Sequence, residues 1–238
     1  MDSRFIRTAA LLGEEAMQRL SGCHVAVFGL GGVGSWCAEA LARSGIGKLT
    51  LIDRDMVSES NINRQLIALS STVGRPKAEV MAERVSDINP ACSVRALTGT
   101  YDAEHREDFF SDYDYVADAI DLLSCKLDLI CTCLGRGIPV ISALGTGNKL
   151  DPTLLRISDI SKTENDALAR VVRKELRARG ILHTTVVWSP ELPMKAEQLE
   201  VPDPGRRSVP GSLAWVPSGA GLLMCSHIVR QLAEKGKS

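Results

Sequence analysis

The 238-residue sequence has few aromatic residues, almost no net charge and no paired cysteine motif. Phe, Trp and Tyr make up 4% of it, and 28 basic residues stand against 29 acidic ones, for a formal net charge of −1. This balance excludes a global electrostatic field that would draw the whole chain onto nucleic acid or an anionic membrane. Any contact with a polyanion must therefore come from a local group of basic side chains.

The seven cysteines lack the C-x-x-C spacing of structural zinc sites and redox pairs, so we expect no structural zinc. Their odd number and their positions in apolar runs predict buried free thiols, which suit a reducing cytosol. The N-terminal residues include Arg4 and Arg7 but no long apolar core, and therefore do not resemble a secretory signal. We expect a cytoplasmic protein.

One stretch without charge, residues 208–229, is long enough to span a membrane. It is interrupted by Pro210, Gly211, Pro217, Gly219 and Gly221. We therefore expect a buried helix that begins at Pro217 or Ser218, and a membrane span is the less favoured alternative.

Apolar runs alternate with helical patterns through residue 147. Strands are expected at 24–28, 48–52, 93–98, 115–120 and 139–143, and helices at 33–44, 76–88 and 124–136. Repeated βα units predict an α/β fold with a Rossmann-like, mostly parallel sheet and helices on both faces.

The remaining residues predict an extension of this sheet. We expect additional strands at 154–160 and 184–188, an amphipathic helix at 165–179 and the closing C-terminal helix. The proline-rich residues 189–212 form either an ordered excursion or a mobile crossover loop. The length suits one domain, 1–238, with a nucleotide-binding half at 1–147 and a substrate-side tail at 148–238.

A glycine-rich motif, Gly29-Leu-Gly31-Gly32-Val-Gly34, follows the first predicted strand. Gly29 permits a tight turn, Gly31 lets the backbone approach a phosphate and Gly34 allows close helix packing, while the helix N-terminus offers N–H groups to an anion. Asp53, 24 residues after Gly29, stands where a carboxylate accepts ribose hydroxyls. This motif alone fits any Rossmann protein that binds a dinucleotide or ATP.

Polar residues beyond the second strand favour ATP. Asn61, Arg64, Gln65 and Lys77 lie within 25 residues of Asp53, past the strand end where ligands of open sheets bind. Two cations and two amides there can hold a triphosphate and neutralise the charge on departing pyrophosphate. The alternative is that Arg64 and Lys77 are solvated charges at helix ends.

A magnesium ligand is expected at the end of the predicted strand 115–120. Asp121 could hold Mg2+ through its oxygens and so bridge the ATP phosphates. Asp118 is a competing candidate, and the two side chains would point to opposite faces of a strand. If the strand stops near Ala119, Asp121 lies at the mouth of the site.

These segments together resemble the adenylation domain of ubiquitin-activating-type enzymes. The resemblance rests on the glycine motif and on Leu51-Ile-Asp-Arg-Asp55, Ser60-Asn-Ile-Asn-Arg-Gln65, Gly74-Arg-Pro-Lys77 and Ile88-Asn-Pro90. It implies that Asp53 binds ribose with Asp55 in the same nucleotide site. It also implies that Asn61, Arg64, Gln65 and Lys77 hold phosphates, and that Asp121 places Mg2+.

The N-terminal segment Arg4-Phe-Ile-Arg7 is similar to an Arg-aromatic-x-Arg motif of that superfamily. The second arginine of that motif reaches the active site of a partner subunit. The resemblance therefore implies a homodimer, and a catalytic part for Arg7 beside Arg64, Lys77 and Asp121.

Within this superfamily the chain best resembles the tRNA threonylcarbamoyladenosine dehydratase family. The resemblance rests on the segments 33–42, 77–84 and 118–121, and extends to 150–152 and 157–163. No cysteine lies between Cys133 and Cys225, where a thioester- or persulfide-forming nucleophile would be sought. The implied reaction is ATP-dependent cyclisation of a threonylcarbamoyl group on an adenosine beside a tRNA anticodon, through an acyl-adenylate.

Two other functions remain open. An adenylyltransferase for the C-terminus of a ubiquitin-like sulfur-carrier protein would use the same ATP site, and a sulfur-transfer or carrier protein is a partner only in that case. An NAD-dependent oxidoreductase is the third candidate. The sequence leaves open whether a monovalent cation binds.

A tRNA partner needs a basic surface despite the balanced charge. The predicted helix 165–179 carries such residues opposite its apolar side, and the proline-rich segment adds two more: Arg170, Arg173, Lys174, Arg177, Arg179, Arg206 and Arg207. These side chains could contact phosphates. A solvated helix face with Glu164, Asp166 and Glu175 interspersed is the equally favoured alternative.

Overall fold

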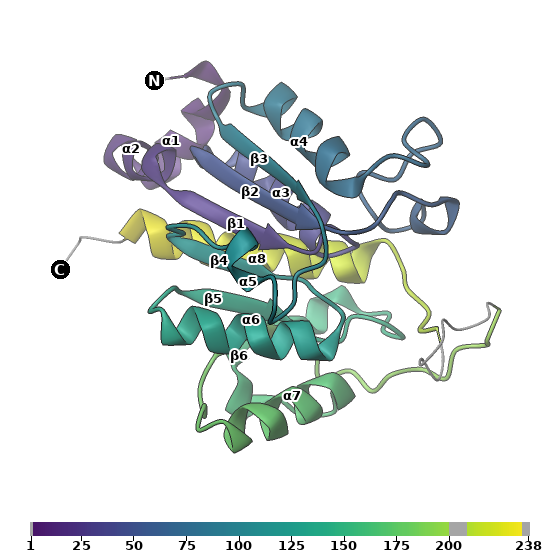
Figure 1. Cartoon of the computed structure of the whole chain (residues 1–238). Coiled ribbons are helices and arrows are strands. Elements are labelled where there is room, and N and C mark those ends of the chain that lie inside the picture. Colours follow the sequence, from purple (N-terminus) through teal and green to yellow (C-terminus); the bar gives the residue numbers. More distant parts are fainter. Residues whose placement is uncertain (1, 200–208, 235–238) are drawn as a thin grey trace.

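The computed structural model describes residues 2–199 and 209–234. One seven-stranded sheet has the order β3-β2-β1-β4-β5-β7-β6 (Figure 1). The strands are β1 (His24–Phe28), β2 (Lys48–Asp53), β3 (Ser93–Thr98), β4 (Tyr115–Asp118), β5 (Val140–Ala143), β6 (Arg156–Asp159) and β7 (Thr185–Trp188). All pairs are parallel except β6 with β7. The α/β, Rossmann-like fold expected from the sequence is confirmed.

Helices cover both faces of the sheet (Figure 1). They are α1 (Ile6–Leu12), α2 (Glu14–Gly22), α3 (Gly34–Arg43), α4 (Lys77–Ile88), α5 (Arg106–Phe109), α6 (Leu123–Gly135), α7 (Ala167–Ala178) and α8 (Trp215–Glu234). α3, α4 and α8 cover one face of the sheet and share its large core cluster, whereas α6 covers the opposite face with α7 beside it.

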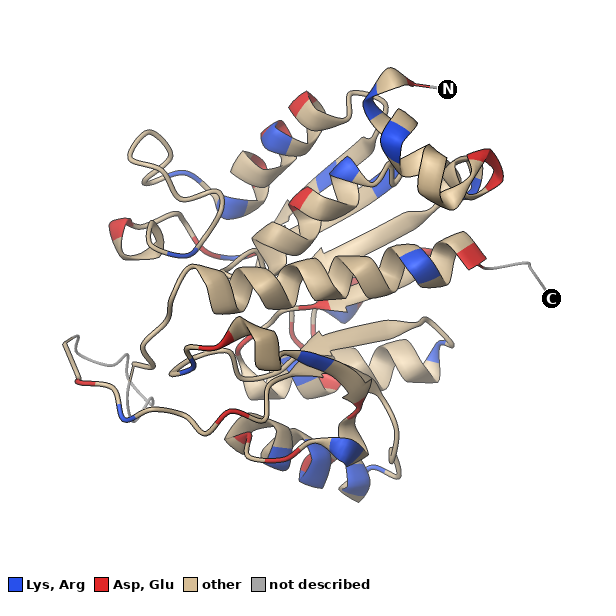
Figure 2. Cartoon of the chain, turned by 180° about the vertical axis from the view of Figure 1, so that it is seen from behind, with Lys and Arg blue, Asp and Glu red and all other residues tan. Residues whose placement is uncertain are grey.

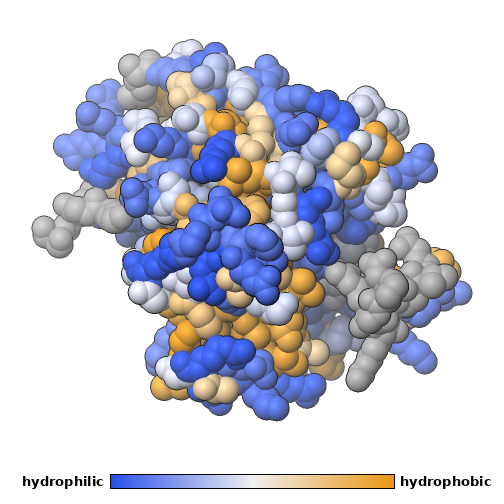
Figure 3. All heavy atoms as spheres, in the orientation of Figure 1, coloured by the Kyte–Doolittle hydropathy of each residue, from blue (hydrophilic) through white to orange (hydrophobic). Residues whose placement is uncertain are grey.

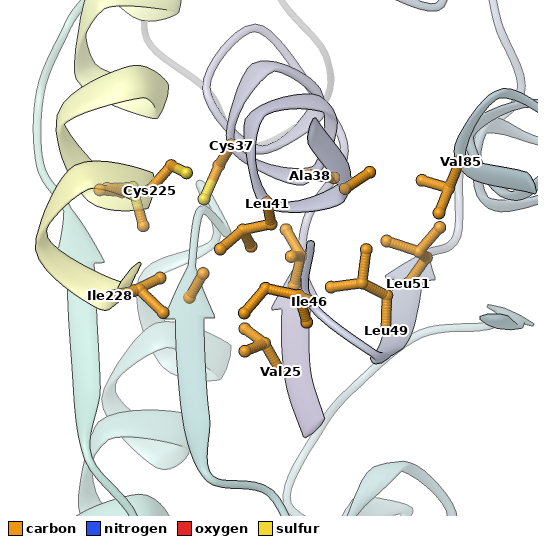
Figure 4. Close-up of a cluster of buried hydrophobic side chains, with 14 of the residues drawn as sticks. Val25, Cys37, Ala38, Leu41, Ile46, Leu49, Leu51, Val85, Cys225 and Ile228 are labelled. Carbon is orange, nitrogen blue, oxygen red and sulfur yellow. The ribbon is translucent and has the colours of Figure 1, made fainter. Parts of the chain in front are cut away.

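The sequence of β1 explains its central place. Its residues 25–28 are fully buried and apolar, because helices cover the strand on both sides. Val25 packs in a cluster with Leu41 of α3 and Ile228 of α8 (Figure 4). Phe28 belongs to the cluster on the other face, where it meets the ring of Tyr101 edge-on at 5.2 Å between centroids.

Several element boundaries differ from the sequence prediction. α1 and α2 were not expected, and α8 begins at Trp215 instead of near Pro217. Pro217 therefore lies inside the first turn of α8, where its missing N–H leaves no hydrogen bond unmade. The predicted strand 154–160 shortens to β6, because the Asp159 carboxylate accepts a hydrogen bond from Ser161 N and caps a short 3₁₀ turn.

The membrane alternative fails for α8. No helix in residues 2–199 or 209–234 is long and apolar enough to cross a membrane. α8 instead buries Ala220, Met224, Cys225 and Ile228 in the large core cluster. Hydrophilic residues cover much of the molecular face in Figure 3, with hydrophobic residues in small groups between them.

A buried ion pair fixes the end of β4. The Lys126 ammonium donates to the Asp118 carboxylate over 2.7 Å, and both side chains are 0% exposed. The other Asp118 oxygen accepts from Ile120 N at 3.1 Å. The strand therefore stops at Asp118, and the chain turns into α6 across the sheet edge where the ligand cavity lies.

This pair generates a stability prediction. Lys126→Met leaves the Asp118 carboxylate buried without its cation, and should lower the free energy of unfolding by about 3–5 kcal/mol. Urea denaturation measures the loss. The control Arg179→Met breaks an exposed pair with Glu175 and should cost less than about 1 kcal/mol. Adding Asp118→Val to Lys126→Met should recover most of the loss, and an equally unstable double variant would show that the buried charge is not the cause.

Candidate nucleotide-binding site

A cavity of about 440 Å³ opens at the carboxyl ends of β1, β2, β4 and β5. The glycine turn, the end of β2 and the segment that follows β4 form one part of its wall. Residues from the tail of the chain form another. Parallel strands deliver their carboxyl ends to one edge, which is why distant motifs of the sequence meet here.

The turn between β1 and α3 depends on two glycines. Gly29 has φ +86°, and a Cβ there would lie 2.7 Å from the Ala119 carbonyl oxygen. A Cβ on Gly34 would lie 1.7 Å from the Gly29 carbonyl oxygen, so no larger residue allows α3 to start so close to the strand. Gly31 and Gly32 line the cavity itself and leave the backbone open to a ligand.

Asp53 ties this turn to the end of β2. One carboxylate oxygen accepts from Leu30 N at 2.6 Å, and the other accepts from Asp55 N at 2.8 Å. Burial raises the pKa of the Asp53 carboxyl, and the charge of Lys77 with the two N–H donors partly offsets that shift. Lys77 is itself buried and donates to the Asp55 carboxylate over 3.0 Å. All three side chains line the cavity.

Arg64 and Gln65 lie on the loop above the glycine turn. Arg64 Nη1 donates to the Ser60 carbonyl over 2.7 Å, and its side-chain carbons lie beside Gly32. The buried Gln65 amide lines the cavity, and its oxygen has no hydrogen-bond partner within the described part of the chain. A buried polar group without a partner is costly, so this amide fits a site whose polar ligand completes its hydrogen bonds.

Asn61 has a different position from these two residues. Its Oδ1 accepts from Ser58 N at 3.2 Å and closes a capping box around the 3₁₀ turn Glu59–Asn61. It is not part of the cavity wall. The side chain thus shapes the loop that carries Arg64 and Gln65.

Asp121 lies at the cavity mouth, as expected for a strand that stops before Ala119. Its side chain is exposed, whereas Asp118 is held by Lys126. Among the described residues, no group of three or more His, Cys, Asp or Glu side chains could hold a metal ion. One carboxylate is enough for Mg2+ when phosphate oxygens and water supply the other ligands, so Asp121 fits that ion together with a bound nucleotide.

Arg7 does not lie near this cavity. It is exposed on α1, and the neighbouring Phe5 packs beside Gly45, which lies just before the amino end of β2. The cavity is at the carboxyl ends of the strands. Figure 1 shows α1 at the other end of the sheet, away from the arrowheads. The Arg7 side chain of the same chain therefore lies away from the nucleotide site.

The far part of the cavity wall was not expected from the sequence. Beyond the end of β5 it carries neutral side chains and backbone only: Leu144, Gly145, Thr146, Gly147, Leu168, Val209, Pro210 and Ser212. No local pattern marks these residues, because the wall forms from three separate segments. This half offers a wall without charged side chains beside the charged nucleotide half.

Tyr101 and Cys125 also line the cavity. Burial raises the pKa of the Cys125 thiol, so the thiol stays neutral and is a poor nucleophile. Its position four residues after Asp121 was a usable signal, since the first turn of the helix after β4 lies at the same edge. The wall therefore offers no activated thiol among the described residues.

Known proteins have a similar sequence and fold. A model of the ThiF family matches residues 3–237. The chain is 46% identical over 240 residues to the tRNA threonylcarbamoyladenosine dehydratase of Bacillus subtilis, covering 96% of this chain and 94% of that protein. The solved Escherichia coli tRNA N6-threonylcarbamoyladenosine dehydratase in complex with ATP is 39% identical, with a TM-score of 0.89 over 98% of this chain and 95% of that chain.

The likeness to sulfur-carrier enzymes is weaker. The sulfur carrier protein ThiS adenylyltransferase of Escherichia coli is 33% identical over 138 residues, which are 57% of this chain and 55% of that protein. The family model and the two dehydratases extend over nearly the full length, including the segments that form the neutral half of the cavity. This chain belongs to the ThiF family.

Proposed function

We propose that this protein activates the carboxylate of threonylcarbamoyladenosine in tRNA with ATP and closes the side chain to a ring with loss of water. The observation that carries the proposal is a single cavity with two unlike halves. The nucleotide half gathers Asp53, Arg64, Gln65 and Lys77, and the other half is neutral. A carboxylate presented from the neutral half would meet the α-phosphate of ATP between them.

The proposed reaction has two steps. A substrate carboxylate oxygen attacks the α-phosphorus, the bond to the bridging oxygen breaks, and pyrophosphate leaves. Arg64 and Lys77 neutralise the charge that develops on the departing group. A ureido heteroatom of the same side chain then attacks the acyl carbon, loses its proton, and displaces AMP. The oxygen removed from the carboxylate leaves in AMP, so the nucleoside loses one water.

An intramolecular second step does not need an enzyme thiol. The attacking atom is already tethered near the acyl carbon, and such tethering replaces a large part of the barrier. This agrees with a cavity whose one cysteine, Cys125, has a raised pKa. A sulfur-carrier adenylyltransferase remains the second candidate, because its ATP chemistry would use the same nucleotide half.

Further parts of the proposal concern metal, partner copy and location. Asp121 would place Mg2+ on the phosphates, and the position of Arg7 away from its own cavity supports a homodimer in which it serves the partner copy. All seven cysteines are free, which supports a reducing cytosol. One continuous sheet containing strands from both halves supports a single domain over 1–238.

The basic side chains of α7 supply the surface for tRNA. Arg170, Lys174 and Arg177 are exposed at helical spacing and make no ion pair or side-chain hydrogen bond to described residues. Arg173 instead donates to the carbonyls of Ile160 and Thr163, and Arg179 pairs with Glu175. Figure 2 shows the gathering of Lys and Arg along α7. Arg206 and Arg207 lie outside the described residues.

The main prediction is a product. Incubation with Mg-ATP and tRNA that carries threonylcarbamoyladenosine should give AMP, pyrophosphate and a nucleoside lighter by one water, detected by mass spectrometry. An unchanged nucleoside mass would refute the proposal. Adenylation of a ubiquitin-like carrier would favour the second candidate. Protection against heating by NAD but not by Mg-ATP would favour an oxidoreductase, because a ligand stabilises only the native state that binds it.

A second prediction concerns the phosphate clamp, by which we mean Arg64 and Lys77. Arg64→Ala should lower substrate-dependent pyrophosphate exchange by about 10²- to 10³-fold, because it removes a charge from the leaving group. Circular dichroism and urea denaturation should show an intact fold. The exposed Arg136, outside the cavity wall, serves as the control, and Arg136→Ala should keep full exchange. Retained exchange in Arg64→Ala would place the clamp elsewhere.

A third prediction tests the α7 surface. The triple variant Arg170→Gln, Lys174→Gln and Arg177→Gln should raise the KM for tRNA by about tenfold or more and leave the KM for ATP unchanged. Its affinity for tRNA should also fall less steeply with salt, by about one unit of slope for each lost phosphate contact. Arg179→Gln, which removes a charge already paired with Glu175, is the control. An unchanged salt dependence would show that tRNA binds another surface of the protein.

A further inference from the structure

The neutral half of the cavity is bounded by a segment that precedes α8. Val209, Pro210 and Ser212 belong to this segment and line the cavity. A Cβ on Gly147 would lie 2.9 Å from Pro210 Cβ, so the loop after β5 and the segment before α8 are in close contact. The segment is therefore part of the site, and its position sets the shape of the acceptor half.

Asn148 holds that segment from the loop after β5. Its N–H donates to the Gly211 carbonyl at 2.7 Å, and its side-chain Oδ1 accepts from Gly211 N at 2.7 Å. Its carbonyl accepts from Met194 N at 2.8 Å. Asn148 therefore holds both Met194 and Gly211, which lie in the two described stretches of chain between β7 and α8. Asn63 adds a fourth hydrogen bond to this region by donating to the Ser212 carbonyl over 2.9 Å.

The backbone of Asn148 is unusual for a residue with a side chain. Its φ is +58°, a left-handed conformation that costs energy for most residues and least for Gly, Asn and Asp. This conformation turns the N–H and the side-chain oxygen toward Gly211 together. Next to it, the buried Lys149 donates to the Ser189 carbonyl over 2.8 Å and pairs with Asp166 over 3.3 Å. These two interactions of Lys149 hold the loop in place next to Asn148.

We propose that Asn148 is a positioning residue that sets acceptor specificity, by latching residues 209–212 as the wall against which the substrate side chain is held. The inference rests on the proposed function for the identity of the acceptor. Asp53, Arg64 and Lys77 of the nucleotide half come from other elements, and none of their hydrogen bonds within the described chain involves Asn148. A loosened latch therefore weakens acceptor binding and leaves ATP binding intact.

The test compares three variants of the full-length protein. Asn148→Gly keeps the left-handed backbone and removes the oxygen acceptor, whereas Asn148→Asp keeps both. Asn165→Gly is the matched control, because Asn165 also has a positive φ (+55°) but donates to the Pro190 carbonyl, away from the cavity wall. Steady-state kinetics with modified tRNA and ATP, and hydrogen–deuterium exchange of residues 209–214, are measured for each.

Asn148→Gly should raise the KM for modified tRNA roughly fivefold and speed exchange in residues 209–214 by a similar factor, the effect of one hydrogen bond on an equilibrium. The KM for ATP should not change. Asn148→Asp and Asn165→Gly should behave as the unaltered protein. Equal increases of both KM values, or unchanged exchange in Asn148→Gly, would overturn the latch. Hydrogen–deuterium exchange needs no substrate. It therefore tests whether Asn148 holds residues 209–212 even if the unaltered protein does not cyclise the nucleoside.

Discussion

The carboxylate of Asp53 joins the glycine turn to the end of β2, and the nucleotide half of the cavity depends on that connection. Its oxygens accept from Leu30 N and Asp55 N, which lie just after β1 and β2 at the edge of the sheet where the cavity opens. A carboxylate has about four lone-pair sites, so two remain to accept hydroxyl groups of a ribose. The same side chain builds the turn and, in the proposed site, would also bind the ribose, so a substitution there would affect both.

The sequence predicted those parts of the molecule that arise from local chemistry. β1, β2 and β3 read as apolar runs, and the glycine motif fixed the turn between β1 and α3. α2 was missed although it buries Ala16, Met17 and Leu20 at helical spacing, a signal that the sequence did carry. α1 was missed because its apolar residues are mostly exposed, Ile6 and Leu11 among them, so their pattern does not mark a buried face. A helix of that kind is defined by its contacts, which a sequence does not display.

Side-chain contacts give the two aspartates at the end of β4 different surroundings. Spacing alone left Asp118 and Asp121 as alternatives, because either could stand at a strand end. The structure places Lys126 against Asp118, eight residues away along the chain and on a different element. That contact removes Asp118 from the cavity and leaves Asp121 at its mouth. For Asn61, in contrast, the spacing Ser58-x-x-Asn61 already carried the signal of a helical cap.

The neutral half of the cavity gives the proposed chemistry a second advantage besides shape. An acyl-adenylate hydrolyses when water reaches its acyl carbon, and an apolar wall excludes that water. Leu144, Leu168, Val209 and Pro210 form such a wall on the side from which the acceptor would enter in the proposed reaction. The nearest competitor for the acyl carbon is then the heteroatom tethered to the same substrate. In the proposed reaction, ring closure would therefore depend on the exclusion of water from the acyl carbon as well as on the residues that bind ATP.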